Sequence, residues 1–498
     1  MSYEIGKGLS RQYLLLRQLH NSSVPLTKND LSKELSCSRP TLNNTLILAD
    51  NLIDRYGSIE KSSDGIILKE KKSINDAYIK AVILKETVLY QFVYSVLFEK
   101  IVSIESWAFD HFMSTSYVYS KMKSIRAFLK ENKLELVTGG EFVSIEGSEH
   151  QIRFLFFQLF KHTSLIDEEW LFSKFNVKAI AQLSRDLAKE LGIYFSPVCE
   201  YQFCVAVAIN LQRSCNDYHG EPYERQWESW NYYQTQFNFN NAFSTFERKI
   251  GKKIEEAERI NILYSIIQLP FRYSSYENAM SRIKNIKTLV PESYQLAKEL
   301  FALFHENPKT NYFGFAYLLD MFAVFSAIDL YQDISVVKLF SDEENEQLFA
   351  NKELVKQVED LISEYEEKSD FYFLKLNRQY LLKSIFQMNQ FSERLRGISK
   401  VIRVTIISEK GYSQELKQGA KFLQQFTQNR IELINSLEVY FDEAHLNVDL
   451  ILSDYYPVHI SSELPIFLWN SEPTEKDFRM LKKQIELLLE GKPDVANE

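Results

Sequence analysis

Two stretches of sequence decide the fold, SRPTLNNTLILADNLI at residues 38–53 and, beginning 76 residues later, STSYVYSKMKSIRAFLKE at residues 114–131. In both, apolar residues recur at i, i+4, i+7 and i+11, the spacing of one buried helix face. These positions are Leu42, Leu46, Ala49 and Ile53 in the first stretch, and Val118, Met122, Ile125 and Leu129 in the second. Each stretch is therefore expected to form a helix with one face in a core and the other face outward.

The flanking sequence gives both helices the same surroundings. The first is preceded by apolar helical patterns at 10–20 and from Thr27, and it is followed by a strand, turn, strand pattern at 59–68 around Asp64-Gly65. The second is preceded by patterns at 87–98 and 104–111 and followed by strands at 134–137 and 142–145. Three helices and a hairpin make a winged helix-turn-helix, so the sequence predicts two such units, over residues 1–72 and 73–150.

A winged helix-turn-helix binds DNA by placing the N-terminal part of its third helix in the major groove. Arginine suits guanine and asparagine suits adenine, whereas serine, threonine and lysine hold phosphates. The predicted DNA-binding residues lie on the outward faces of the two helices and in the first wing: Ser38, Arg39, Thr41, Asn43, Asn44, Lys61, Ser116, Tyr119, Ser120, Lys121 and Lys123.

Composition favours a long, helical, multidomain chain. It has 498 residues with only 15 glycines and 11 prolines, about half the usual frequencies, so helix breakers are few. The net charge is −9, but residues 1–150 carry 19 Lys+Arg against 18 Asp+Glu, which leaves room for a local DNA-binding face. The four cysteines lack any Cys-x-x-Cys spacing, and the chain has no Gly-rich phosphate loop. We therefore expect no enzyme activity, no cofactor and no metal site.

The rest of the chain divides into a helical middle and an α/β tail. Helical patterns fill residues 151–396 and predict two bundles, 151–287 and 288–396, with a joint near residues 285–290. Residues 397–498 alternate strands and helices, which predicts a small α/β domain with a partly parallel sheet. The segment 431–439 fits either a helix or a strand. The longest apolar stretch, Phe313–Ile328, contains Asp320 and is too short for a membrane span, so a cytoplasmic protein is expected.

This order of domains resembles the Mga/AtxA-type virulence regulators of Gram-positive bacteria. The segments that carry the resemblance are Ser38–Leu42, Phe112–Leu129 with its following wing, Phe203–Arg213 and Ile266–Tyr273. The resemblance implies a mainly α fold in which the bundles are phosphotransferase-system regulation domains (PRDs) and the tail is similar to the EIIB component of sugar phosphotransferases. It also implies a transcriptional activator that binds double-stranded promoter DNA as a homodimer or higher oligomer and is phosphorylated on histidine by phosphotransferase-system proteins.

The sequence departs from this pattern in both regulatory parts. The helix expected to bear a PRD histidine, Phe203–Arg213, contains none, which leaves His219 and His305 as candidate phosphorylation sites. Ser408 stands where EIIB proteins carry a phosphoryl-accepting cysteine, and no cysteine follows Cys215. A thiolate-based phosphotransfer is thereby excluded, and the tail is expected to be a structural, oligomerising module.

Three further classes compete with this interpretation. The first, a phosphotransferase enzyme, is disfavoured by the missing cysteine. A protein-interaction scaffold whose winged helices do not bind DNA fits the acidic total charge. An RNA-binding antiterminator would share the bundles but should begin with a small β-rich domain, which the helical start of this chain argues against.

Overall fold

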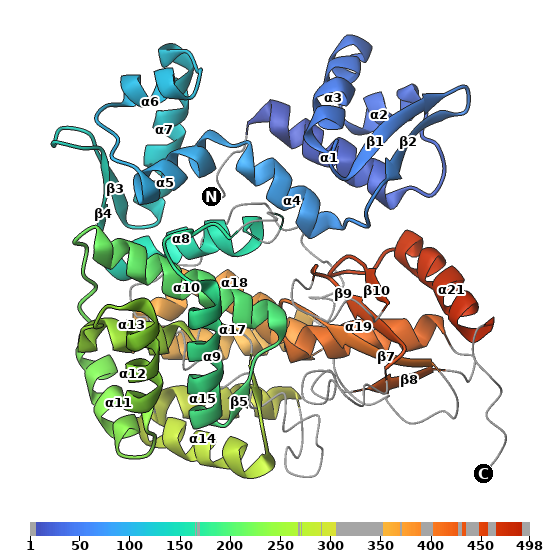
Figure 1. Ribbon diagram of the computed structural model, residues 1–498. Helices are drawn as coiled ribbons and strands as arrows, with labels where there is room; N and C mark the ends of the chain where they lie inside the picture. Colours follow the sequence, from blue (N-terminus) through green and yellow to red (C-terminus); the bar gives the residue numbers. More distant parts are fainter. Residues whose placement is uncertain are drawn as a thin grey trace, which may run out of the picture.

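The computed structural model describes residues 6–164, 166, 170–266, 269, 271–289, 291–304, 352–368, 371–389, 402–426, 431–434, 448–456 and 465–490. Over these residues the chain is mainly helical, with a small sheet near its C-terminal end (Figure 1). The helix predicted at 312–331, the apolar stretch 313–328 and the predicted boundary at 396/397 lie outside the described residues.

The first unit, residues 7–70, contains every element predicted for it. Its helices are α1 (Lys7–Asn21), α2 (Lys28–Glu34) and α3 (Arg39–Leu52), and its wing is the antiparallel pair β1 (Gly57–Ser62) and β2 (Gly65–Glu70). Thr27 and Ser38 cap α2 and α3 by accepting hydrogen bonds from the backbone N–H groups of Asp30 and Thr41. The four apolar residues of the stripe that begins at Leu42 and ends at Ile53 are fully buried, as their spacing predicts.

The second unit, residues 88–147, repeats this arrangement with a shorter wing. It contains α5 (Val88–Phe98), α6 (Ile104–Asp110), α7 (Thr115–Glu131), β3 (Leu134–Val137) and β4 (Ser144–Gly147). The sequence predicts the second wing strand at 142–145, but the strand begins two residues later. The reason is that the backbone N–H of Val143 donates to the carbonyl of Ile101, outside the hairpin, at 2.7 Å.

A helix that the sequence did not predict, α4 (Asp76–Lys85), joins the two units. Its side chains Ile79, Ala81, Val82, Ile83 and Leu84 are all buried, so it lacks the polar face that marks a surface helix. In the part of the chain that the structure describes, no single helix is long and apolar enough to cross a membrane, although α4 and α5 together, bent by 68°, pass by length and composition.

The second unit shares its hydrophobic core with the first helical bundle. Tyr90 and Phe98 of α5 pack on Phe160 and Phe172, with ring centroids 5.5 and 5.2 Å apart. The bundle consists of α8 (Glu149–Thr163), α9 (Val177–Leu191), α10 (Pro197–Cys215), α11 (Glu224–Gln234), α12 (Phe239–Ile250) and α13 (Glu256–Ser265). Its residues form one buried cluster with those of α5–α7. Helix α8 runs across the predicted boundary at 150/151, so that boundary does not fall between two elements.

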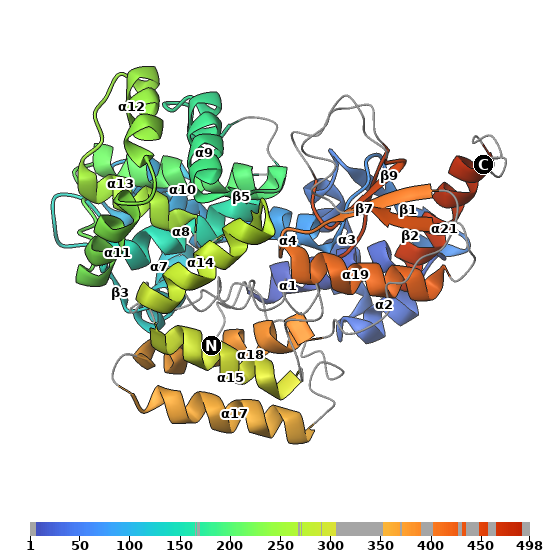
Figure 2. The ribbon, with the colours of Figure 1, turned by 90° about the horizontal axis from the view of Figure 1, so that it is seen from below.

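The second bundle has a core of its own. It is built from α14 (Tyr276–Leu289), α15 (Pro291–Phe304), α17 (Lys352–Glu366) and α18 (Tyr372–Asn389), with Leu296, Leu300, Ile362 and Ile385 fully buried. Figure 2 shows α15, α17 and α18 grouped apart from α8–α13, with α14 between the two groups. Because Ile283 of α14 belongs to the second core, this core begins before the joint predicted near residues 285–290. A short antiparallel pair, β5 (Ile193–Tyr194) with β6 (Arg272–Tyr273), links the chain on either side of α10–α13.

The C-terminal module is a four-stranded parallel sheet with helices. The strands β7 (Ile402–Ile407), β8 (Ile431–Ile434), β9 (Leu450–Ser453) and β10 (Ile466–Leu468) follow the order β10-β9-β7-β8, and every described pair is parallel. The helices are α19 (Tyr412–Gln425) and α21 (Glu475–Glu490). The tail is therefore α/β as predicted, with a wholly parallel rather than a partly parallel described sheet, and residues 431–434 are a strand.

Polar contacts join this module to the first unit. Asn75, the N-cap of α4, donates to the carbonyl of Trp469 at 3.2 Å, and the backbone N–H of Asp76 donates to Asn470 at 2.6 Å. Lys476 of α21 lies 3.2 Å from the carboxylate of Glu70, at the end of the first wing. Figure 1 shows α21 beneath the first unit, on the side of that unit away from α3.

Candidate nucleic-acid interface

The two helix-turn-helix turns have the same backbone geometry. In the first, Ser36 has φ 46° and Cys37 N–H donates to the carbonyl of Ser32; in the second, Phe112 has φ 54° and Met113 N–H donates to the carbonyl of Ala108. This is a Schellman helix ending, whose left-handed residue is usually glycine or asparagine. Serine or phenylalanine there costs roughly 1–2 kcal/mol of conformational energy. In both units a serine N-cap follows two residues later and starts the recognition helix.

The outward face of α3 is polar and partly pre-ordered. Arg39 is exposed and donates to the side-chain oxygen of Asn29 on α2 at 2.7 Å, which fixes the guanidinium at the start of the helix. The hydroxyls of Ser38 and Thr41 lie 2.9 Å apart. Asn43 and Asn44 are exposed in the next turn. The structure thus brings the predicted residues of the first unit to one end and face of α3, except Lys61, which is exposed on β1.

The outward face of α7 carries the predicted residues of the second unit. Ser116, Tyr119, Ser120 and Lys123 are exposed. The Tyr119 hydroxyl donates to the carboxylate of Glu105 on α6, and this hydrogen bond raises the pKa of Tyr119 and lowers that of Glu105. Lys121 is half-buried, with its ammonium 5.6 Å from the centroid of the Tyr117 ring. Lys123 is the predicted cation that extends from this face.

Charge is distributed differently over the two units. Residues 1–72 carry 11 Lys+Arg against 8 Asp+Glu, a net +3, whereas residues 73–150 carry 8 against 10, a net −2. The recognition helices show the opposite difference in net charge. Helix α7 holds four cations (Lys121, Lys123, Arg126 and Lys130) and one carboxylate, whereas α3 holds one of each. Positive charge is therefore concentrated on the recognition helix in the second unit and lies outside it in the first.

The two wings also differ in their charged side chains. In the first, Lys69 forms an ion pair with Glu60 at 3.1 Å, and Lys61 and Lys71 are exposed. In the second, Glu135 and Glu146 stand opposite each other in the register of β3 and β4. Because carboxylates repel phosphate groups, the first wing fits a contact with the DNA backbone better than the second.

Comparison with protein families identifies one part of this interface. Residues 72–160 match the Mga helix-turn-helix domain. The match runs from just before α4 through the second unit into α8, and the buried residues of α5–α8 in it belong to one core. It confirms the predicted helix-turn-helix of the second unit and indicates a DNA-binding, Mga-like transcription regulator. A comparison with curated proteins gave no match.

Of the two candidate phosphorylation sites, only His219 lies among the described residues. His219 is exposed in the loop after α10, and its neighbours are held in place, because Arg153 donates to the carbonyl of Tyr218 at 3.1 Å and Asn261 to that of Gly220 at 2.7 Å. His305 lies outside the described residues. His150, which the sequence did not single out, is buried against the ring of Tyr223, and burial lowers the pKa of its imidazole. In the described part of the chain, no group of three or more His, Cys, Asp or Glu could hold a metal ion.

Ser408, which the resemblance sets against a phosphoryl-accepting cysteine, is fully buried. Its hydroxyl donates to the carboxylate of Asp454 at 2.7 Å, and Gln418 and Ser471 donate to the same carboxylate oxygen. Burial raises the pKa of Asp454. The hydrogen bond between Ser408 and Asp454 ties the loop after β7 to the residue that follows β9.

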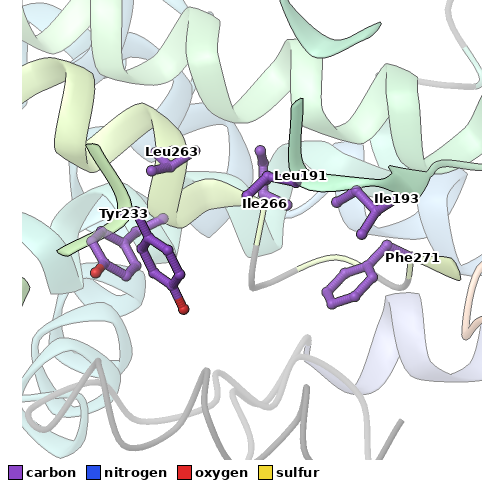
Figure 3. A pocket seen from close by; sticks show the side chains of 7 residues that line it. Leu191, Ile193, Tyr233, Leu263, Ile266 and Phe271 are labelled. Atoms are coloured by element: carbon purple, nitrogen blue, oxygen red, sulfur yellow. The ribbon is translucent and has the colours of Figure 1, made fainter. Parts of the chain in front are cut away.

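Two pockets in the first bundle differ in their lining. Figure 3 shows the apolar one, lined by Leu191, Ile193, Tyr233, Leu263, Tyr264, Ile266 and Phe271, with no carboxylate, amine or imidazole among them. The other lies beside Arg153, whose guanidinium is engaged by Glu149, Glu258 and Asn210 at 2.6–2.9 Å. These polar groups satisfy one another and so stabilise the bundle.

Proposed function

We propose that this protein is a transcriptional activator that binds promoter DNA through both winged helix-turn-helix units. The observation that carries the proposal is the repeated turn and capped recognition helix, found once inside the Mga helix-turn-helix match and once before it. Figure 1 places α3 and α7 on the same side of the molecule, away from the bundles, an arrangement that suits contact with one duplex.

The two units are proposed to make different contacts with DNA. At the start of α3, Arg39 can donate two hydrogen bonds to guanine, and Asn43 can donate one to adenine and accept one from it. The lysines of α7 supply phosphate contacts that set register and affinity. Because such contacts release counterions, binding is expected to weaken steeply with salt despite the net charge of −9.

The regulatory half is proposed to follow the resemblance to the Mga/AtxA type. The two bundles act as PRD-like domains, and His219, exposed in a held loop, is the residue that phosphotransferase-system proteins would modify. Incubation with the general phosphotransferase proteins and phosphoenolpyruvate should place a phosphohistidine on His219, and the modification should vanish in His219→Ala. Labelling that remains in this variant would assign the site elsewhere, and absence of labelling would remove the link to sugar supply.

The C-terminal module is proposed to be an EIIB-like part without catalytic function that supports self-association. The buried Ser408–Asp454 pair supports this, because neither group is available for transfer chemistry. Sedimentation should show a homodimer or higher oligomer that becomes monomeric when residues 397–498 are removed. A monomeric full-length chain would contradict this role.

A protein-interaction scaffold is the second candidate, and the net charge of −2 over residues 73–150 favours it. Selection of bound fragments from a random-sequence duplex library, followed by a transcription reporter driven by the selected sequence, separates the two. The DNA-binding proposal predicts one enriched sequence and chain-dependent transcription. If no sequence is enriched at any salt concentration, the scaffold is favoured.

A further inference from the structure

Two large aromatic side chains are exposed at the end of α6 and in the turn that follows it. Phe112 is 99 % exposed and Phe109 is 81 % exposed. In the first unit the residue that corresponds to Phe112 is Ser36, which has the same left-handed backbone and the same pair of turn hydrogen bonds. The aromatic ring is therefore a property of the second unit and is not required by the turn.

Folding does not explain the ring. A left-handed backbone disfavours a bulky residue, and glycine or asparagine would suit the turn better. A fully exposed phenyl group also gains nothing from burial in the folded chain. Conformational outliers of this kind concentrate at sites where a partner binds. A partner that covers Phe112 is accordingly the simplest reason for its presence.

The position of Phe112 next to α7 points to DNA as the partner. It lies two residues before Ser114, the N-cap of α7, so it adjoins the end of the helix that enters the major groove. The face of α7 that follows carries the exposed Ser116, Ser120 and Lys123, groups that hold phosphates. In the major groove, the apolar group that an aromatic ring can cover is the C5 methyl of thymine.

We propose that Phe112 contacts a thymine methyl group at the edge of the site read by the second unit and so sets a preference for thymine there. This inference rests on the proposed DNA binding. It adds a specificity-determining residue that makes no hydrogen bond to the DNA.

The test replaces thymine by uracil, one position at a time, in a duplex selected by the full-length chain. This change removes only the methyl group, and loss of one buried methyl should weaken binding about fourfold. In Phe112→Gly, which suits the left-handed turn, affinity for the thymine duplex should fall by about the same factor, and the uracil effect at that position should disappear. Ser36→Gly is the matched control, because it alters the same turn position in the first unit and should leave the uracil effect intact.

Each other outcome overturns the inference. An equal uracil effect in wild type and Phe112→Gly, or no uracil effect at any position, would show that the ring does not touch a methyl group. Unchanged DNA affinity in Phe112→Gly together with weakened self-association would assign the ring to contact with a second copy. Failure of the wild-type chain to bind any duplex would instead refute the proposed function, so the two failures are distinguishable.

Discussion

The two winged helix-turn-helix units share a backbone and differ in chemistry. Their turns, caps and buried helix stripes correspond residue by residue across the 76-residue offset. The first presents Arg39 and two asparagines on a nearly uncharged helix, with lysines in its wing, whereas the second presents lysines on the helix and carboxylates in its wing. A shared scaffold geometry thus fixes where a recognition helix lies and leaves what it reads to the surface residues.

The units also differ in how they are attached. The second is continuous with the core of the first bundle, through ring contacts such as Tyr90 with Phe160. The first has a separate core and meets the C-terminal module through polar contacts at Asn75, Glu70 and Lys476. The second unit is therefore attached to the bundle by a continuous apolar core, whereas the described contacts between the first unit and the C-terminal module include buried and part-buried polar ones.

The largest expected effect comes from a cavity in the shared core. Phe160→Ala should cost about 3–5 kcal/mol of stability, since Phe160 is fully buried and contacts three aromatic rings of α5. Hydrogen exchange should accelerate in both α7 and α10. Leu46→Ala, a fully buried residue of the first unit, is the control and should accelerate exchange in the first unit and in α4, which contributes Ile79 and Ile83 to the same core, but not in α7 or α10. Protection of α7 that survives Phe160→Ala would show that the second unit folds independently.

The next effect concerns base recognition by the first unit. Arg39→Ala with Asn43→Ala should weaken binding to the selected duplex by about 1–3 kcal/mol for each bidentate hydrogen-bond pair that the substitutions remove. Both residues are exposed, so the melting temperature should be unchanged. Asn51→Ala, exposed in the last turn of the same helix, should bind like wild type. Unaltered affinity in the folded double variant would remove α3 from recognition.

A smaller effect is expected from the phosphate contact of the second unit. Lys123→Ala should reduce the slope of log affinity against log salt by about 0.9, the value for one phosphate. Lys123→Arg keeps the charge and should keep the slope. If the slope for Lys123→Ala matches wild type, the lysine does not contact phosphate, and the charge difference between the two recognition helices loses its functional meaning.

The smallest effect is a pH dependence of the stability that the first unit gains from its contact with the C-terminal module. Burial raises the pKa of Glu70, but the hydrogen bond from His20 and the charge of Lys476 outweigh it and lower the pKa below the ordinary 4.5. A carboxylate with a lowered folded-state pKa contributes stability above its unfolded pKa, and this contribution is lost as pH falls through the folded value. Lys476→Met should therefore destabilise residues 7–70 near neutral pH, and the difference from wild type should shrink below about pH 4.5. A pH-independent difference would mean that the ion pair with Glu70 is not its cause.

Local patterns predicted most of the fold, and long-range packing accounts for the rest. The stripes of α3 and α7 are readable in the sequence because each helix buries one face only. Helix α4 was missed because it is buried on several sides and shows no clear periodicity. The sequence does not reveal that α8 crosses the boundary predicted at 150/151 and packs on α5, because neither segment shows this contact by itself.

The candidate DNA-binding site, like the fold, could be predicted only in part from the sequence. The outward residues of both recognition helices follow from helical periodicity, and the structure places them as expected. Phe112 was missed because the usual signal for a left-handed turn is glycine or asparagine, and phenylalanine gives no such signal. Alignment of the two units at the 76-residue offset, which pairs Phe112 with Ser36, is the observation that would have found it.

The measurement that tests the central claim most directly is fluorescence anisotropy of the selected duplex, titrated with the full-length chain at several salt concentrations. The account predicts saturable binding whose log affinity falls linearly with log salt, with contributions from both units, so that the Arg39/Asn43 variant and the Lys123 variant each bind less tightly. Absence of saturable binding by the folded wild-type chain even at low salt would contradict DNA binding and leave the scaffold as the better account.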